Sequence, residues 1–221
     1  MDQDATYLTE KYPGEQTFWE PLLVRFFAQN TNRLKLKVYQ IDADQHDRRF
    51  RLRLAKPYFA VTRAMAQQLF GDRLLAPIEE ATGLKLRDDP RRYLRPGMDD
   101  AGIKVDLLHV DGPSVTLLEI KPFDTSEFSG NHLAGGSYPR FVRWLGSRGI
   151  DCQYLFAMPY AAMWKKGSEF NDLQCELGLA FGFVLFEDIF SEMSRCGFKY
   201  EGISEPWEDY VKKEAQYFPQ Q

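Results

Sequence analysis

The chain has 221 residues, of which 44% are hydrophobic and 27% charged, so it can build one sizeable folded domain and is not expected to be disordered. Its net charge of −4 does not indicate a nucleic-acid binder, although a local basic surface would not show in that sum. The acidic start resembles no secretory signal, and no apolar run approaches the roughly 20 residues of a membrane span, so we expect a cytoplasmic protein without a membrane partner. The 3 cysteines form no CxxC pair, so we expect neither a disulfide framework nor a zinc ribbon.

Segments in the first part of the chain alternate between helical and strand patterns. Apolar residues recur at helical spacing over Phe18–Gln29, which predicts an amphipathic helix. Leu34–Ile41 and Arg48–Ala55 alternate apolar and polar residues, as two strands joined across a polar stretch would. The helical pattern returns over Tyr58–Ala81, and Gly83 is its expected end.

The second part of the chain predicts the order strand, strand, helix, strand, helix, strand. These elements are expected in a hairpin over 104–121, then, after a glycine-rich loop at 122–136, at 139–147, 152–158, 168–180 and 181–188. The alternation predicts an α/β fold with a mixed central sheet flanked by helices. Residues 1–57 are expected to form an N-terminal addition of a helix and a strand pair, packed on a core at 58–221 within one compact domain.

The hairpin KVDLLHVDGPSVTLLEIK carries acids and lysines on strands that are otherwise apolar. The stretch DGPS at 111–114 is typical of a tight turn, and such a turn would place Asp106 directly opposite Glu119. Lys121 shares their face because side chains alternate along a strand, with Lys104 beside them. The opposite face of the hairpin is expected to be an apolar surface fit for a core, made of Val105, Leu107, Thr116, Leu118 and Ile120.

Like charges directly opposite each other destabilise a sheet, and poor solvation increases the penalty. A cation between the carboxylates of Asp106 and Glu119 would remove that penalty, and hard carboxylate oxygens suit Mg²⁺ or Mn²⁺. Such a metal lowers the pKa of bound water, and Lys121 could orient or help to deprotonate the attacking water. The hairpin therefore predicts a metal-dependent hydrolytic site. The alternative is a surface hairpin whose acids pair with its own lysines.

Asp106, followed after 12 residues by Glu119-Ile120-Lys121, resembles the signature of the PD-(D/E)XK nuclease superfamily, although Val105 stands where proline often precedes the aspartate. The resemblance covers roughly residues 78–188 and implies a restriction-endonuclease-like core. It also implies that Asp106, Glu119 and the backbone carbonyl of Ile120 hold Mg²⁺ or Mn²⁺, with Lys121 activating the water.

Members of this superfamily often carry a further metal-binding glutamate on the helix before the core sheet. By that resemblance we assign Glu80, next to Glu79, and keep Glu20 as the second choice. Two adjacent acids near a helix end are also common as solvated side chains.

Nucleic-acid contacts are expected from the helix after the glycine-rich loop, where the resemblance places Tyr138, Arg140 and Arg143 near the site. The basic runs at 48–53 and 87–95, which include Arg91 and Arg92, would supply phosphate contacts. The alternative for these arginines is an ordinary solvated face.

The function expected from these residues is DNA cleavage by a Mg²⁺-dependent endonuclease, in restriction or another phage–host conflict. A homodimer is expected because double-strand cleavage needs two active sites. An RNA endonuclease on the same fold is the first alternative, and a cleavage assay with matched DNA and RNA separates the two. A catalytically silent nucleic-acid-binding module is the second, and it would bind without cleaving. The chain contains no HExxH, Walker loop or GxSxG motif, which removes support for those enzyme classes.

Overall fold

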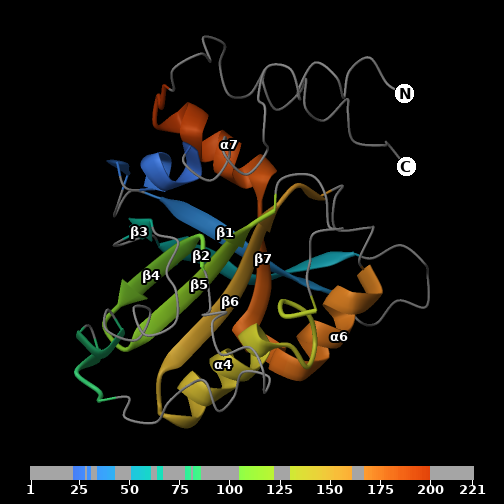
Figure 1. The fold of residues 1–221 in the computed structure, drawn as a ribbon. Coiled ribbons are helices and arrows are strands. Elements are labelled where there is room, and N and C mark those ends of the chain that lie inside the picture. The colour runs from blue at the N-terminus through green and yellow to red at the C-terminus, as the bar shows by residue number, and fades with distance from the viewer. Residues whose placement is uncertain are drawn as a thin grey trace.

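The structure is a computed structural model that describes residues 22–27, 29–30, 34–42, 51–60, 64–66, 78–80, 82–85, 105–121, 130–160 and 167–199. These residues are organised around a mixed sheet of seven strands in the order β2-β1-β7-β6-β5-β4-β3 (Figure 1). The strands are β1 Lys35–Ile41, β2 Leu52–Ala60, β3 Ala64–Ala66, β4 Leu107–Asp111, β5 Ser114–Ile120, β6 Asp151–Met158 and β7 Phe181–Leu185. β5, β6 and β7 run parallel, and the other neighbouring pairs are antiparallel. The mixed α/β fold is therefore confirmed.

Helical crossovers connect the three parallel strands, as parallel pairing requires. Helix α4, Ser137–Ser147, joins β5 to β6. Helix α6, Gly167–Leu177, and the short 3₁₀ helix Gly178–Ala180 lead from β6 to β7. The predicted order of strands and helices over this part of the chain is confirmed.

Both faces of the sheet are covered by helices (Figure 1). On one face, β5, β6 and β7 pack with α4 and α6 in a core that includes Phe141, Trp144, Tyr154 and Phe156. On the other face, the helical residues 22–27 pack with α7, Phe186–Arg195, in a second core. The described residues at 22–27 confirm part of the helix predicted near the start of the chain. No helix among the described ranges combines the length and apolar composition needed to cross a membrane.

The strand predicted at 181–188 ends at Leu185, because the next ten residues form α7. The buried residues of α7 are Phe186, Ile189, Phe190 and Met193, which follow the i, i+3, i+4, i+7 spacing of one helix face. This helix was not predicted, since its first apolar residue directly continues the apolar run of β7.

The helix predicted over Tyr58–Ala81 is wrong for most of the described residues in that range. The chain at 58–60 completes β2, whose last residue pairs with Lys35, and 64–66 form β3 against β4. Pairing with strands distant in sequence overrides the local helical pattern here. Residues 78–80 are helical, and Gly83 ends this turn with φ 68° and its N–H bonded to the Glu79 carbonyl at 2.8 Å.

The first two strands belong to the same sheet as the rest of the chain. β1 joins β7 through the pair Tyr39 and Phe183, and β2 spans the boundary expected between residues 57 and 58. The strand pair therefore extends the central sheet.

Gly182 on β7 allows β1 to approach closely. A Cβ at this position would lie 2.6 Å from Val38 Cγ1 and 3.0 Å from the Tyr39 carbonyl oxygen. We expect Gly182→Ala to lower the free energy of unfolding by about 1–3 kcal/mol, because the added methyl overpacks the junction. Urea unfolding measures the change.

The control is Gly146→Ala on α4, where a Cβ meets no atom within 4 Å. We expect this variant to be neutral or up to about 1 kcal/mol more stable, because alanine favours helix. Equal destabilisation by both substitutions would contradict the close approach of β1 to β7.

Candidate active site on strand β5

The hairpin has the predicted register. β4 and β5 pair Leu107 with Leu118 and Val110 with Val115, so the turn lies where DGPS placed it. Asp106 immediately precedes β4, and its Oδ2 accepts the backbone N–H of Ile120 at 2.7 Å. The aspartate is therefore fixed beside the Glu119-Ile120 peptide.

The chain bends at Asp106, and the strand alternation stops there. Val105 packs in the same core as Leu108 and Leu117, on the face covered by α4 and α6. Its predicted position on the opposite face is therefore wrong. Leu107, Leu118 and Ile120 do share one apolar face, as predicted, and that face packs in the core with α7.

Glu119 and Lys121 lie at the carboxyl end of β5, with only 2% and 8% of their surfaces exposed. Glu119 Oε2 is 3.8 Å from Lys121 Nζ, an ion pair. The Lys121 N–H bonds to the Ala157 carbonyl of β6 at 2.9 Å, so the parallel pairing continues one residue past β5. The backbone on both sides of Glu119 is thus held by the sheet.

The electrostatic cost of this arrangement is large. Removing a charge from water costs several kcal/mol even when an opposite charge is close. β5 lies between β4 and β6 with both faces buried, so a leucine at position 119 would fit the surrounding core better than a carboxylate does. Retaining charged groups here is typical of a functional site.

Three aromatic side chains pack on one another on the side of the sheet that α4 covers, and of the three only Tyr138 was assigned to the site from the sequence. Tyr154 on β6 is fully buried, and its hydroxyl is 2.9 Å from Nδ1 of His132. The His132 ring stacks on Tyr138 with centroids 4.3 Å apart, and Tyr138 stacks on Tyr154 at 5.7 Å. His132 lies in the glycine-rich loop, where sequence alone gives no partner, and Tyr154 lies in an apolar strand, so only the fold brings them together.

Burial and the nearby charges perturb this aromatic group. Burial, and then the positive charge of Lys121, lower the pKa of His132 from 6.5 to about 3. Burial, followed by electrostatic interactions with Glu119, Tyr138 and Asp106, raises the pKa of Tyr154 well above its usual value. At neutral pH the imidazole is therefore uncharged and the phenol protonated.

The remaining predicted residues lie in different settings. Tyr138 is 7% exposed and belongs to the core, so its ring is not presented to solvent. Arg143 is half exposed and pairs with Glu176 of α6 at 2.8 Å, while Arg140 is partly buried. Glu80 is exposed, two residues after the buried Ile78. Arg91, Arg92, Glu20 and Lys104 lie outside the described residues.

Two carboxylates at this site, those of Asp106 and Glu119, are the candidate ligands for a metal ion. Within the described ranges, no group of three or more His, Cys, Asp or Glu side chains is arranged to hold a metal ion. Asp106 is fixed at the backbone N–H of Ile120, the residue that follows Glu119, and hard carboxylate oxygens suit Mg²⁺, which keeps several waters and needs only one or two protein carboxylates. The residues present therefore fit Mg²⁺ better than zinc, whose structural sites take four protein ligands.

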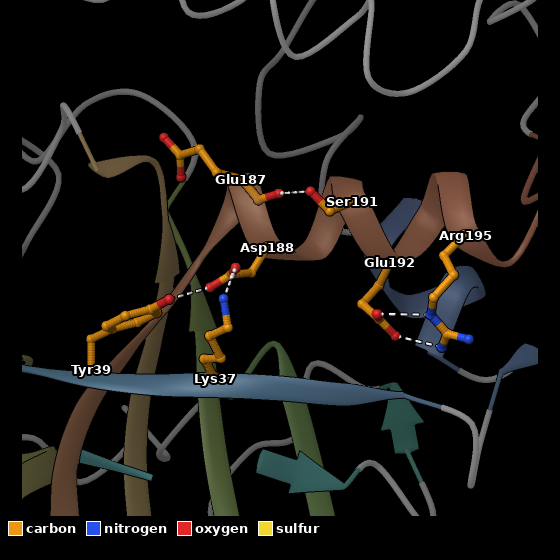
Figure 2. Close-up of polar contacts among 7 residues, drawn as sticks. All are labelled: Lys37, Tyr39, Glu187, Asp188, Ser191, Glu192 and Arg195. Carbon is orange, nitrogen blue, oxygen red and sulfur yellow. Dashed lines mark hydrogen bonds and ion pairs between the residues drawn. The ribbon is translucent and has the colours of Figure 1, made fainter. Parts of the chain in front are cut away.

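A second polar cluster fastens α7 to β1 (Figure 2). Asp188 accepts a hydrogen bond from the Tyr39 hydroxyl at 2.8 Å and pairs with Lys37 at 3.3 Å. Further along the helix, Arg195 pairs with Glu192 at 2.7 Å. Asp188, Tyr39 and Lys37 therefore act as a structural clamp between the helix and the strand.

Comparison with family models, with curated proteins and with solved structures finds no match for this chain.

The depressed pKa of His132 predicts a pH-dependent stability. The unfolded chain takes up a proton near pH 6.5 that the folded chain refuses until about pH 3, so stability falls as pH drops through this window. One such proton contributes a slope of at most about 1.4 kcal/mol per pH unit. We expect His132→Gln to flatten the dependence of the unfolding free energy on pH between 6.5 and 4, measured by urea unfolding. An unchanged slope would contradict the buried neutral state of His132.

Proposed function

We propose that this protein is a metal-dependent endonuclease of the PD-(D/E)XK type, which hydrolyses phosphodiester bonds in DNA. The observation that carries the proposal is the convergence of Asp106, Glu119 and Lys121 at one end of β5, with Asp106 fixed at 2.7 Å from the Ile120 nitrogen. The succession β4, β5, α4, β6 around these residues supports a restriction-endonuclease-like core.

The position of the site in the sheet supports a ligand-binding role. β5, β6 and β7 are parallel, so their carboxyl ends meet at one edge of the sheet. Ligands of open α/β sheets bind outside this edge. Glu119 and Lys121 occupy the end of the middle strand of the β4-β5-β6 group, where both neighbours restrain the backbone.

Asp106 and Glu119 would hold Mg²⁺ or Mn²⁺, with the Ile120 carbonyl as a further oxygen ligand. When bound, the metal would lower the pKa of a water molecule and offset charge on the phosphate. The buried surroundings of Glu119 favour such a cation, because poor solvation strengthens its attraction to the carboxylates.

Lys121 would act on the attacking water. Its ammonium group, 3.8 Å from Glu119 Oε2, can donate a hydrogen bond to that water or to a phosphate oxygen. The water then attacks phosphorus, its proton leaves to a neighbouring base or to solvent, and the bond from phosphorus to the leaving oxygen breaks. Lys121 thereby orients the nucleophile in line with the bond that breaks.

The outer strand of the sheet offers basic side chains for a nucleic acid. Glu119 pairs with Phe156 on β6, which pairs with Phe183 on β7. Phe183 in turn pairs with Tyr39 on β1, and Tyr39 pairs with Leu54 on β2. Four strand spacings separate Glu119 from Leu54, which is about 19 Å. The residues around Leu54 include the exposed Arg53 and Lys56 on this strand and the exposed Arg51 immediately before it.

RNA is the alternative substrate, since phosphate contacts alone do not distinguish the two nucleic acids. A homodimer would supply the second active site that double-strand cleavage requires. A nucleic-acid-binding module without catalysis is the alternative from another class, and it would leave the buried charge on β5 without a chemical purpose.

Nucleic-acid cleavage should depend on both metal and the two carboxylates. We expect nicking of plasmid DNA with Mg²⁺ or Mn²⁺, none with EDTA, and a decrease of about 100-fold or more in Asp106→Asn and Glu119→Gln. Asp106→Asn retains an oxygen that can accept the Ile120 N–H, so the hairpin should stay folded. Gel analysis of matched DNA and RNA substrates gives the rates.

Asp188→Asn is the matched control, because this carboxylate follows β7 and belongs to the clamp of α7 and β1 described above. It should cut at the parental rate. Cleavage of RNA alone would select the RNA endonuclease, and binding without cleavage of either substrate would select the silent module.

The basic residues on β2 and immediately before it should control the salt dependence of nucleic-acid binding. Replacing Arg51, Arg53 and Lys56 with alanine should reduce the slope of log affinity against log salt by up to about 0.9 for each phosphate that is no longer neutralised. Fluorescence anisotropy with a labelled duplex measures the slope. Arg195→Ala, which removes the partner of Glu192 on α7, is the control, and an equal change in both proteins would argue against a specific role for β2.

A further inference from the structure

A buried glutamine on β1 has both ends of its side-chain amide engaged. Gln40 is 2% exposed, and its Nε2 lies 2.8 Å from the carbonyl oxygen of Gly178 and 2.8 Å from that of Phe181. Both hydrogens of the amide nitrogen are therefore donated to the main chain where the 3₁₀ helix leads into β7. Because the nitrogen must face these carbonyls, the side-chain oxygen Oε1 must face away from them.

The main chain next to Gln40 is held as well. The Ile41 N–H donates to Gln174 Oε1 at 2.7 Å, and Gln174 Nε2 donates to the Ile41 carbonyl at 2.8 Å. Gln174 lies on α6, so these bonds join the end of β1 to that helix. The fold alone therefore sets the direction of Gln40 Oε1.

Arg53 on β2 is the partner of that oxygen. It lies directly opposite Gln40 in the register of the two strands, and its Nη2 donates to Gln40 Oε1 at 3.3 Å. Arg53 is exposed, although the amide that holds it is buried. A guanidinium carries several N–H donors in a rigid fork, so one bond to Gln40 leaves donors for a ligand.

The neutral anchor distinguishes Arg53 from other arginines. Arg143 pairs with Glu176 at 2.8 Å. Arg195 pairs with Glu192 at 2.7 Å, so a carboxylate offsets the charge in both cases. Within the ranges that the structure describes, Arg53 bonds to an amide and pairs with no carboxylate. An amide orders the side chain without neutralising it, which leaves the positive charge for an anion.

We propose that Gln40 positions the Arg53 guanidinium as a phosphate-binding group for the nucleic-acid backbone. Ordering the guanidinium before binding removes part of the entropy cost of fixing a long side chain. A fork of N–H groups with a set orientation matches two oxygens of one phosphate. This inference rests on the nucleic-acid substrate of the proposed function, and it does not require cleavage.

Arg53 is accordingly the principal phosphate contact among the basic residues of this strand. Arg51 and Lys56 are exposed too, but the described part of the chain gives neither side chain a buried acceptor. They attract phosphate by charge, and the ordering of their side chains is left to the bound state.

The first test measures positioning without a ligand. Relaxation of the arginine ¹⁵Nε–H groups should show an ordered Arg53 side chain in the parental protein and a mobile one in Gln40→Met, which keeps the side-chain length and loses the acceptor. Arg195 is the internal control, because its Nε bonds to Glu192 on α7 and reports whether the variant is folded (Figure 2). Equal order of Arg53 in the two folded proteins overturns the positioning role.

The second test measures nucleic-acid binding in EDTA, by fluorescence anisotropy with a labelled duplex. We expect Arg53→Ala to weaken binding about tenfold and to reduce the slope of log affinity against log salt by about 0.9. Gln40→Met should weaken binding severalfold at the parental slope, since the charge remains and only its position is lost. Parental affinity in folded Gln40→Met overturns the proposal.

Two surface variants keep the test independent of folding and decide it where Gln40→Met does not fold. Arg53→Lys keeps the charge and loses the fork, so it should bind severalfold more weakly at the parental slope. Arg51→Ala is the matched control, and it should weaken binding less than Arg53→Ala does. Parental affinity in Arg53→Lys, or equal losses in Arg51→Ala and Arg53→Ala, overturns the proposal.

The outcomes for binding and for cleavage are separable. Binding that depends on Arg53 in a protein that cuts neither DNA nor RNA would reject the proposed nuclease and support the phosphate contact. Metal-dependent cleavage together with parental affinity in Arg53→Ala would keep the nuclease and overturn the contact. Failure of the parental protein to bind either nucleic acid overturns the contact outright.

Discussion

The burial of charge at the carboxyl end of β5 is the constraint on which the rest of this structure depends. Glu119 and Lys121 are 2% and 8% exposed on a strand that is covered on both faces. Each buried ion costs several kcal/mol of solvation, and an ion pair at 3.8 Å recovers only part of that cost. The surrounding architecture is arranged to hold these charges rather than to avoid them, because Asp106 fixes the Ile120 N–H and Ala157 fixes the Lys121 N–H.

The apolar burial in the two cores, one on each side of the sheet, offsets the free-energy cost of burying these charges. Aromatic residues are concentrated on the α4 and α6 side, where Phe156, Phe170, Phe181 and Phe183 pack on one another in tilted and edge-to-face arrangements. These pairs add to the burial of apolar surface. Tyr138 and Tyr154 belong to the same aromatic layer, and Phe156 pairs in register with Glu119, so the core directly adjoins the candidate site. A substitution in this layer is therefore expected to affect the site as well as the fold.

The parts of the molecule that local chemistry determines could be predicted from the sequence. The DGPS turn sets the register of the hairpin, which brings the residue before β4, Asp106, to the end of β5, where it accepts the Ile120 N–H. Prediction failed where distant partners decide the structure. Residues 58–60 and 64–66 join β-ladders with β1 and β4, although their spacing favours a helix. The pair of His132 and Tyr154 was out of reach for the same reason, since a loop residue and a strand residue meet only after the sheet has formed.

The central claim is that Asp106 and Glu119 together bind a divalent metal, and binding of Mn²⁺ in the absence of nucleic acid tests it most directly. Electron paramagnetic resonance of free Mn²⁺ gives the affinity for the parental protein, for Asp106→Asn with Glu119→Gln, and for Asp188→Asn. Our account predicts a site in the parental protein and in Asp188→Asn, and affinity at least about tenfold weaker in the double variant. Equal affinity in all three folded proteins would contradict it and would identify Glu119 and Lys121 as a structural ion pair.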